Sequence, residues 1–493
     1  MLTVEAMLKR KPLLIVGSQV VVFLLNACGS STPLSVQDPV VANISALPGG
    51  YNPLSCAVTA DVGNAVTVRV AYSAESGPDG TTPDFAVSSS SVTIPVLGLM
   101  PETNYTLVLQ AIGADGTTVE SDSASCLTGA LPSTLPAFAV SEQAGTEPGY
   151  TMIGLIQGLF SGSSSSGGES STPIAGPLIV DHTGRIVWYR EGFEGAVTDW
   201  QKQPDGTYTA AINQIYIPEL GYNDNRYFQL DSLGNVIRTY SALGWPTDNH
   251  ELRLLSNGDA LLMANNSQTM DLTPWGGRPS VVVFGDVLQR ISPTGGQLFA
   301  WDALNGLDIG STDPLILQDL ADADSLDFTH ANAIDVSADG SYLISLRNLS
   351  QVIKVNQSGS IVWRLGGVNS DFQFVNDPLG RFSLQHGMRE LPNGNILLFD
   401  NGVGHQLPQS RAVEYQLNLT AMTATLVWQY NADPPLFGPF LGFTQRLENG
   451  NTLITYGAHP VIREVDPAGE VVWELQGAPT DGFSRAIRIS SLY

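Results

Sequence analysis

Three of the chain's six histidines occupy the same place in a repeated pattern. His250, His330 and His386 are each followed, eight or ten residues later, by the glycine of an Asn-Gly or Asp-Gly pair. A histidine at one structural position in successive repeats places several imidazoles around a common site. Imidazole titrates near neutral pH, so such a site can supply a nucleophile, a general acid or metal ligands.

The pairs predict which side chains face the histidines. Asn-Gly and Asp-Gly are typical of two-residue β-hairpins, in which residues equally distant from the turn lie opposite each other. The predicted facing pairs are His250 with Asn265, Asn332 with Arg347, and His386 with Asn401. His330 lies two residues before Asn332, on the same side of its strand. His405 follows Asn401 closely and could reach the same place.

A second repeat indicates the architecture that positions these hairpins. Strand-like segments end in Gly-x-Val/Ile-x-Trp or in a looser form of it, six times, 45 to 65 residues apart. The six segments end at Trp188, Arg238, Trp301, Trp363, Trp428 and Trp473. Repeats of this length without helical periodicity predict an all-β fold, a six-bladed β-propeller over residues 148–493. Inserted loops blur the repeat in residues 270–325, and a seventh blade in this segment is the alternative.

The first strand of a propeller blade usually lies nearest the axis, so the histidines, Arg347 and the asparagines are expected at the channel mouth. Three histidines with Arg347 favour an anionic ligand, because they concentrate positive potential there. A zinc trio is the chemical alternative. Against it, Arg347 would repel a cation, and no Asp or Glu occupies the ring positions. We therefore expect no metal. A polar lining without chemistry is the remaining interpretation.

Composition limits the partners. The formal net charge is −25 with 14% charged residues, which disfavours nucleic acid and anionic membrane surfaces as ligands. An anionic substrate would then need a local positive site, which the histidines and Arg347 would provide.

The N-terminus has the pattern of an export signal. Basic residues 9–11 precede the apolar run 13–25, which is too short for a confident membrane span. It ends in a segment that resembles a bacterial lipobox at Cys28. We expect residues 1–28 to be a lipoprotein signal peptide, with Cys28 lipidated and the protein anchored at the cell envelope, in the periplasm or on the outer membrane of a Gram-negative bacterium. An ordinary secretory signal is the alternative.

Residues 29–45 are expected to be a tether, 46–128 a small β-sandwich and 129–147 a Pro-rich linker. The segment from Leu99 to Tyr105 resembles the tyrosine corner of fibronectin type III domains, Leu-x-Pro-x-Thr-x-Tyr. Cys56 and Cys126 fall within this domain, and export implies an oxidising compartment. We predict a disulfide between them, with two buried thiols as the alternative.

The densest run of motifs lies between Phe328 and Gly402. It contains Phe328-Thr-His-Ala-Asn332, Ser345-Leu-Arg347, Ile361-Val-Trp-Arg-Leu-Gly-Gly367, Phe382-Ser-Leu-Gln-His386 and Phe399-Asp-Asn-Gly402. In these motifs the chain resembles the bacterial arylsulfate sulfotransferases. The resemblance implies transfer of a sulfuryl group from a phenolic sulfate ester to a phenol, without a nucleotide donor or other cofactor.

The resemblance also implies roles for four residues. His386 matches the family histidine that becomes transiently sulfated, and His250, His330 and Arg347 match residues that bind and polarise the sulfuryl group. Asn332, Asn401, Asn265 and His405 are weaker candidates for substrate binding. The competing hypotheses are a non-catalytic propeller lipoprotein for binding or adhesion, and a metal- or quinone-dependent propeller enzyme. The sequence leaves a homodimer open.

Overall fold

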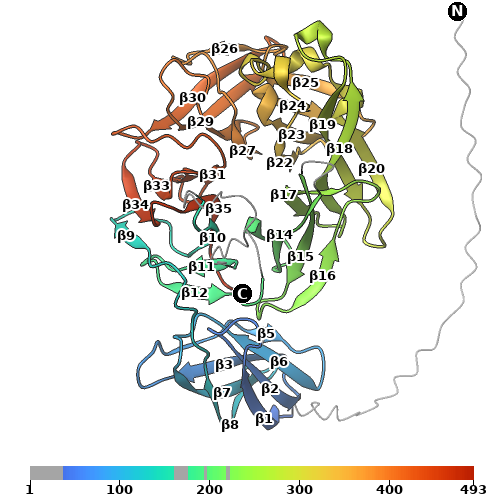
Figure 1. The fold of residues 1–493 in the computed structure, drawn as a ribbon. Helices are drawn as coiled ribbons and strands as arrows, with labels where there is room; N and C mark the ends of the chain where they lie inside the picture. Colours follow the sequence, from blue (N-terminus) through green and yellow to red (C-terminus); the bar gives the residue numbers. More distant parts are fainter. Residues whose placement is uncertain (1–36, 160–175, 194–196, 218–221) are drawn as a thin grey trace, which may run out of the picture.

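The computed structural model describes residues 37–159, 176–193, 197–217 and 222–493. The fold is all-β, with a few short helical turns (Figure 1). No helix in these ranges is long and apolar enough to cross a lipid bilayer. The predicted signal peptide with Cys28, and the first part of the predicted tether, lie outside the described residues.

The N-terminal domain consists of two packed antiparallel sheets. One sheet contains β1 (Val40–Pro48), β2 (Cys56–Gly63) and β6 (Ser91–Val96). The other contains β3 (Thr67–Ser73), β4 (Gly80–Thr81), β5 (Phe85–Ala86), β7 (Asn104–Ile112) and β8 (Thr118–Leu127). Alternate side chains of β7, among them Leu107 and Leu109, are fully buried in the shared core, as the alternation predicts.

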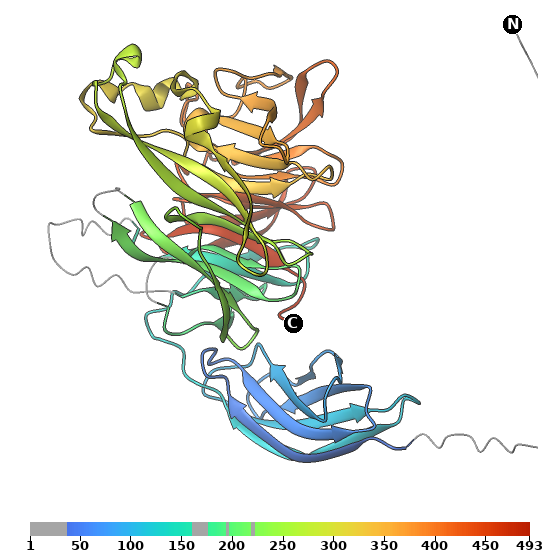
Figure 2. The ribbon, with the colours of Figure 1, turned by 90° about the vertical axis from the view of Figure 1, so that its right-hand side faces the viewer.

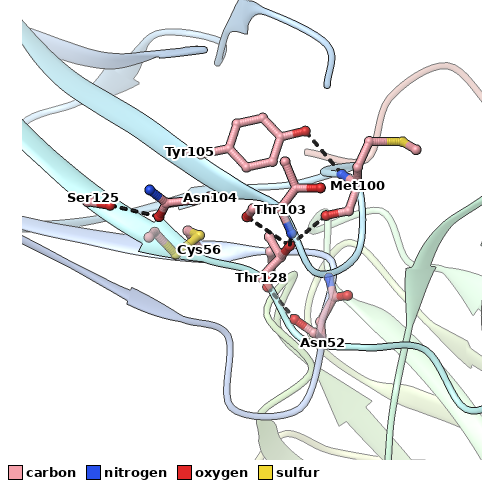
Figure 3. Close-up of a disulfide and its surroundings, with 10 residues drawn as sticks. Asn52, Cys56, Met100, Thr103, Asn104, Tyr105, Ser125 and Thr128 are labelled. Carbon is pink, nitrogen blue, oxygen red and sulfur yellow. Dashed lines mark hydrogen bonds between the residues drawn. A yellow bond between two sulfur atoms is a disulfide. The ribbon is translucent and has the colours of Figure 1, made fainter. Parts of the chain in front are cut away.

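The predicted disulfide between Cys56 and Cys126 is formed, and it joins β2 of one sheet to β8 of the other (Figure 3). In the same region the hydroxyl of Tyr105 accepts a hydrogen bond of 3.1 Å from the backbone nitrogen of Met100 (Figure 3). Strand β1 begins at Val40, so the sandwich starts inside the segment predicted as a tether, 29–45. Pairing with β2 orders residues 40–45, although the composition of the segment is that of a linker.

The remaining described strands form six sheets, antiparallel except for two short parallel pairings, arranged in a ring (Figure 1). In ring order, the first sheet contains β10 (Tyr150–Ile156), β11 (Leu178–Val180), β12 (Ile186–Tyr189) and β35 (Gly482–Ile489). The second contains β13 (Val197–Lys202), β14 (Tyr208–Ile217), β15 (Tyr222–Leu230) and β16 (Val236–Tyr240). The third contains β17 (Thr247–Leu254), β18 (Ala260–Met270), β19 (Val281–Ile291) and β20 (Gln297–Asp302). The fourth sheet contains β22 (Ala331–Val336), β23 (Tyr342–Leu346), β24 (Gln351–Val355) and β25 (Ile361–Gly366). The fifth contains β26 (Gln373–Val375), β27 (His386–Glu390), β28 (Ile396–Asp400), β29 (Arg411–Asn418) and β30 (Thr423–Asn431). The sixth contains β9 (Ala139–Glu142), β31 (Phe443–Arg446), β32 (Thr452–Thr455), β33 (Val461–Val465) and β34 (Val471–Gln476).

Strands from both ends of the ring domain close the ring. The inner strands β35, β13, β17, β22, β27 and β31 each contact the next, and β31 contacts β35 again. Strand β35 completes the sheet of β10, and β9 pairs with β34 of the last sheet. Because β9 lies at 139–142, the ring begins inside the segment predicted as a linker, 129–147. The six Trp-type segments all map to the fourth strands: β12, β16, β20, β25, β30 and β34.

The segment 270–325 extends one sheet and adds helical turns. Long strands β18 and β19 reach beyond the ring, and a helical insertion follows β20. The short elements here are η1 (Thr273–Trp275), α1 (Ala303–Gly306), η2 (Ile309–Ser311), α2 (Pro314–Leu317), η3 (Leu320–Asp322) and β21 (Ser325–Asp327). Strand β21 returns to pair in parallel with β19. The inserted loops that blurred the repeat therefore belong to the β17–β20 sheet.

The Asn-Gly and Asp-Gly turns have one residue more than predicted. In the hairpin of β27 and β28, Leu391 N donates to Asn395 O and Gly394 N donates to Leu391 O, both at 2.8 Å. Gly394 has φ of 82°, so the loop is a type I turn followed by a left-handed glycine. Equivalent bonds close the other hairpins, at Leu255, Ser337, Gln203 and Leu447. The extra residue shifts every predicted facing pair by one position.

The sandwich packs against the first sheets of the ring (Figure 2). The hydroxyl of Tyr493 accepts a hydrogen bond of 3.1 Å from Leu97 N, and its ring packs edge-on against Phe85. The guanidinium of Arg190 lies 4.5 Å from the centre of the Tyr51 ring. The sandwich thus contacts the outer part of the ring.

Candidate active site

Three neighbouring inner strands carry the three repeated histidines. His250 lies within β17, His330 immediately precedes β22, and His386 is the first residue of β27. The rings of His250 and His330 pack edge to face, with centroids 5.1 Å apart. Both also act electrostatically on His386 and help to lower its pKa, so the structure brings together side chains that are separated by up to 136 residues.

A hydrogen-bond network fixes the tautomer of His386. Nδ1 of His386 lies 2.7 Å from Oδ1 of Asn401. The amide nitrogen of Asn401 donates to the carbonyls of Gly438, at 2.7 Å, and Leu441, at 2.9 Å. Asn401 must therefore present its oxygen to the imidazole, so Nδ1 carries the hydrogen. The lone pair of His386 is left on Nε2.

The electrostatic environment keeps His386 uncharged. Burial, followed by the positive charge of Arg347, holds the pKa of His386 well below its ordinary value. The hydrogen bond to Asn401 opposes this shift but does not reverse it. A neutral imidazole with a defined lone pair on Nε2 is the form that acts as a nucleophile.

His250 is held by a buried carboxylate. Its Nδ1 lies 2.9 Å and 3.1 Å from the two carboxylate oxygens of Asp248. Burial alone would lower the pKa of His250, but the charge and hydrogen bond of Asp248 outweigh it and raise the pKa above the ordinary value. His250 is therefore the better proton donor, and its Nε2–H is the group left to donate.

His330 has an unusual backbone and a carboxylate partner. Its φ is 47°, in the left-handed region that few non-glycine residues adopt. Its Nδ1 lies 2.5 Å from Oδ2 of Asp327, and its carbonyl accepts a 3.1 Å hydrogen bond from Arg347 N. This contact joins the backbones of His330 and Arg347.

Asp286 on β19 anchors the residues on both sides of His330. One carboxylate oxygen accepts hydrogen bonds of 2.6 Å from the hydroxyl of Thr329 and from Ala331 N. Burial raises the pKa of Asp286 to about 8. These bonds hold the strained conformation of His330 from the interior.

Arg347 lies at the start of the helical turn η4 (Arg347–Leu349) and is bound by neutral groups. Nη1 donates to Oδ1 of Asn348 at 2.8 Å, and Nη2 contacts the carbonyl of Pro439 at 3.4 Å. Its Nε is buried without a hydrogen-bond partner in the described part of the chain. Both acceptors of its hydrogen bonds are uncharged, so no carboxylate among the described residues bonds to the guanidinium, and Asp327 acts on its charge through space.

Two of the predicted facing pairs are wrong. Asn265 N donates to Pro246 O at 2.8 Å, so Asn265 lies opposite the residues before β17 and not opposite His250. Arg347 faces His330, as its backbone bond shows, and Asn332 instead donates a 2.7 Å hydrogen bond to the carbonyl of Gln385. The longer turns and the bulges in these hairpins account for both errors.

The third predicted pair meets through its side chains, although the register differs. His386 lies opposite Phe399 in the β27–β28 ladder, and a bulge lets its ring reach Asn401. His405 has other partners: its Nε2 lies 2.8 Å from Oδ2 of Asp400, which also binds Arg411. His405 therefore lies beside the buried ion pair of Asp400 and Arg411 within the β27–β30 sheet.

The sequence repeat did not reveal the carboxylates of Asp248 and Asp327, because they do not lie at the repeated positions that carry the histidines. Asp248 and Asp327 precede their histidines by two and three residues. A search for acidic residues close before each repeated histidine would have found them. Carboxylates that bind Nδ1 orient an imidazole and set its proton affinity.

A second missed group is a buried ion network among the inner strands. Arg485 bonds Asp199 at 2.6 Å and Glu251 at 3.2 Å, and Arg389 binds the same Glu251. Both arginines stack on the ring of Phe443. Burial raises the pKa of Asp199 to about 6. The network lies directly beside the histidines, since Arg485 also contacts the carbonyl of His250 at 3.4 Å.

Together these residues suit the transfer of an anionic group. His386 offers a neutral nitrogen nucleophile, His250 a proton donor and Arg347 a cation with unused donors. Arginine matches the oxygens of sulfate and phosphate esters because its planar fork donates several hydrogen bonds at once.

The comparisons with known proteins agree with this chemistry. The model of the arylsulfotransferase (ASST) family matches residues 230–478, which is more than half of the chain and includes all three histidines and Arg347. The chain belongs to this family, so the resemblance seen in the motifs is confirmed. The family supports aryl sulfotransferase activity broadly and implies aryl sulfate and phenol substrates.

Other comparisons are more distant. No curated protein matches the chain. Among solved structures, a protein of unknown function from Bacteroides caccae is similar at 16% identity and a TM-score of 0.41, over 69% of this chain and 98% of that one. A streptogramin B lyase has 11% identity and a TM-score of 0.37, over 69% and 87%. A virginiamycin B lyase from Staphylococcus aureus has 11% identity and a TM-score of 0.34, over 70% and 89%. None of these is similar enough to say what this protein does.

Proposed function

We propose that this protein is a nucleotide-independent aryl sulfotransferase that moves a sulfuryl group from a phenolic sulfate ester to a phenol through a sulfohistidine at His386. The observation that carries the proposal is the bond from His386 Nδ1 to Asn401, which leaves the lone pair on Nε2 of a neutral imidazole. Covalent catalysis of this kind divides one difficult displacement into two easier ones.

In the first step, Nε2 of His386 attacks sulfur and the bond from sulfur to the phenolic oxygen breaks. The departing phenolate takes a proton from His250, whose pKa is raised next to Asp248. Arg347 and His330 stabilise the three equatorial oxygens, where charge collects in a loose, in-line transition state like that of phosphoryl transfer.

In the second step, the oxygen of the acceptor phenol attacks the sulfur of sulfo-His386. The nitrogen–sulfur bond breaks, and the acceptor's proton passes to His250. His386 and His250 then return to their starting protonation states. The mechanism needs no cofactor, and it requires ping-pong kinetics, because the first phenol leaves before the second binds.

Release of phenol from a chromogenic aryl sulfate tests the function, with and without an added phenol, beside the His386→Ala variant. We expect release that increases with the acceptor and is lost in the variant. Absence of release from a range of aryl sulfates, in folded protein, would favour the binding-propeller alternative.

We further propose that the ring is a six-bladed propeller and that the sandwich is a fibronectin type III-like spacer. The inner-strand contacts that close the ring and the hydrogen bond of Tyr105 in the corner support this assignment.

The proposed location is the cell envelope, with the chain exported and anchored through Cys28. The disulfide fits an oxidising compartment. Loss of membrane fractionation in Cys28→Ser would test the anchor.

A further inference from the structure

A surface depression adjoins the candidate active site on the side of the helical insertion. Its volume is about 300 Å³. Its lining is partly apolar and partly polar. Its apolar lining residues are Ile316, Leu320, Ala323 and Leu326, and its polar ones include Asp327 and Arg347. The depression thus connects the cation that would bind a sulfuryl group with an apolar surface.

The insertion that forms the walls is bound to the segment that carries Arg347. Asp313 N donates to the carbonyl of Asn348 at 2.8 Å, and Ser350 donates to the carboxylate of Asp313 at 2.7 Å. Asn348 also donates to the carbonyl of Asp327 at 2.7 Å and accepts from Arg347 at 2.8 Å. One asparagine therefore sets the position of Arg347 relative to the depression.

The back of the depression is part of the hydrophobic core. Leu320 and Leu326 are buried in the core cluster that the β17–β20 and β22–β25 sheets share, and the pairing of β21 with β19 holds Leu326 in place. Ile316 and Ala323 are only partly buried and offer apolar surface to the outside. Walls of this kind exist before a ligand binds, which lowers the entropic cost of binding.

We propose that this depression is the subsite for the aromatic ring of the sulfate ester or phenol, an inference that rests on the proposed function. A sulfuryl group at Arg347 would place the ring of its ester against Ile316 and Ala323. A cavity of roughly 150 Å³ suffices for benzene, so a depression of about 300 Å³ accommodates a two-ring aryl group. The half-exposed carboxylate of Asp327, which also lines the depression, disfavours rings with anionic substituents.

A second depression, which also borders α2, provides a matched control. It is lined by Leu315, Arg381, Ser383 and His405, with a volume of about 210 Å³. Leu315 and Ile316 are neighbours on one short helix but border different depressions. The second depression does not contain Arg347, so changes there should leave aryl recognition intact.

The test compares two donors, 4-nitrophenyl sulfate and the two-ring 4-methylumbelliferyl sulfate, in the full chain. Ala323→Phe fills the subsite, and we expect kcat/KM for the two-ring donor to fall about tenfold or more relative to the one-ring donor. Ile316→Ala widens the subsite and should raise the ratio of kcat/KM for the two-ring donor to kcat/KM for the one-ring donor. Leu315→Phe should leave it unchanged. A loss of folded protein would lower the measured kcat/KM for both donors by the same factor and leave their ratio unchanged. The ratio therefore reports recognition of the aryl group.

Binding of naphthalene-2-sulfonate, measured by calorimetry, separates this inference from the proposed function. Its carbon–sulfur bond prevents transfer, so binding does not depend on catalysis. Turnover of aryl sulfates with an unchanged donor ratio in Ala323→Phe and Ile316→Ala would overturn the subsite but not the function. If the wild type binds naphthalene-2-sulfonate but does not turn over aryl sulfates, and Ala323→Phe loses that binding, the subsite is supported and the proposed function is rejected.

Discussion

Replacing Asn401 by aspartate places a negative charge on the group that orients the proposed nucleophile. The side-chain oxygen of Asn401 lies 2.7 Å from Nδ1 of His386. In the wild type, burial and the charge of Arg347 keep the pKa of His386 well below its ordinary value, so the imidazole stays neutral into mildly acidic pH. Asn401→Asp keeps the shape and an acceptor oxygen but loses the two hydrogen bonds that the amide donates to the carbonyls of Gly438 and Leu441. It adds a charge that favours the protonated, non-nucleophilic imidazole.

Coulomb's law gives the size of the effect. Unit charges about 4 Å apart attract by about 4 kcal/mol at an effective dielectric constant of about 20. One pKa unit corresponds to about 1.4 kcal/mol, so the upper limit is a rise of about three units. The cost of burying the new carboxylate reduces this gain. We expect the pKa of His386 to rise by about one to three units.

The pH dependence of donor kcat/KM is the assay, because its acid limb reports the protonation of His386 in the free enzyme. In Asn401→Asp the limb should move to higher pH by the same one to three units. Asn356→Asp is the matched control. Asn356 lies in the β24–β25 turn, and its side-chain oxygen accepts only backbone and hydroxyl hydrogen bonds that aspartate can also accept. An acid limb that stays in place in Asn401→Asp would refute the reasoning.

Three further predictions follow from the same geometry. Asp248→Asn removes the charge that raises the pKa of His250, so the basic limb of the donor pH profile should move to lower pH; an unmoved limb would exclude His250 as the proton donor. Arg347→Lys replaces a fork of donors by one ammonium group and should lower kcat at saturating donor by about 10²-fold, whereas a purely structural arginine would change stability instead. Replacing both Cys56 and Cys126 by serine opens a link between residues 70 apart. Calorimetry should then show the sandwich about 4 kcal/mol less stable, with aryl sulfate turnover retained, and a parallel loss of turnover would show that the domains are coupled.

The repeats in the sequence carried most of the information about the fold. The Trp-type segments fall on the fourth strand of each of the six sheets. The positions of His250, His330 and His386 on successive inner strands follow from the same periodicity. The disulfide could be predicted because only Cys56 and Cys126 remain after Cys28 is set aside.

Register could not be predicted from the turn residues alone. Gly394 occupies the left-handed position of a three-residue loop, and glycine suits this loop as well as the two-residue one. Bulges then shift the pairing again near His386. Because a one-residue slip turns a side chain to the other face, facing pairs derived from the turns were wrong even where the histidines were placed correctly.

The ion network was hidden because its members come from distant parts of the chain. Arg485 lies on the closing strand β35 and meets Glu251, which lies 234 residues earlier, only when the ring closes. The helical insertion was also beyond prediction from the repeat, since its lack of periodicity shows only that loops are inserted. Its contacts with the segment of Arg347 depend on tertiary packing.

The central claim is that His386 carries the sulfuryl group between donor and acceptor. Protein mixed with excess aryl sulfate, without acceptor, should release a burst of one phenol per active site. Mass spectrometry under mildly alkaline conditions should then find one added SO₃ on the peptide containing His386, and adding a phenol should remove it. His386→Ala should show neither the burst nor the adduct. A stoichiometric adduct on another residue, or normal transfer by His386→Ala, would contradict the account.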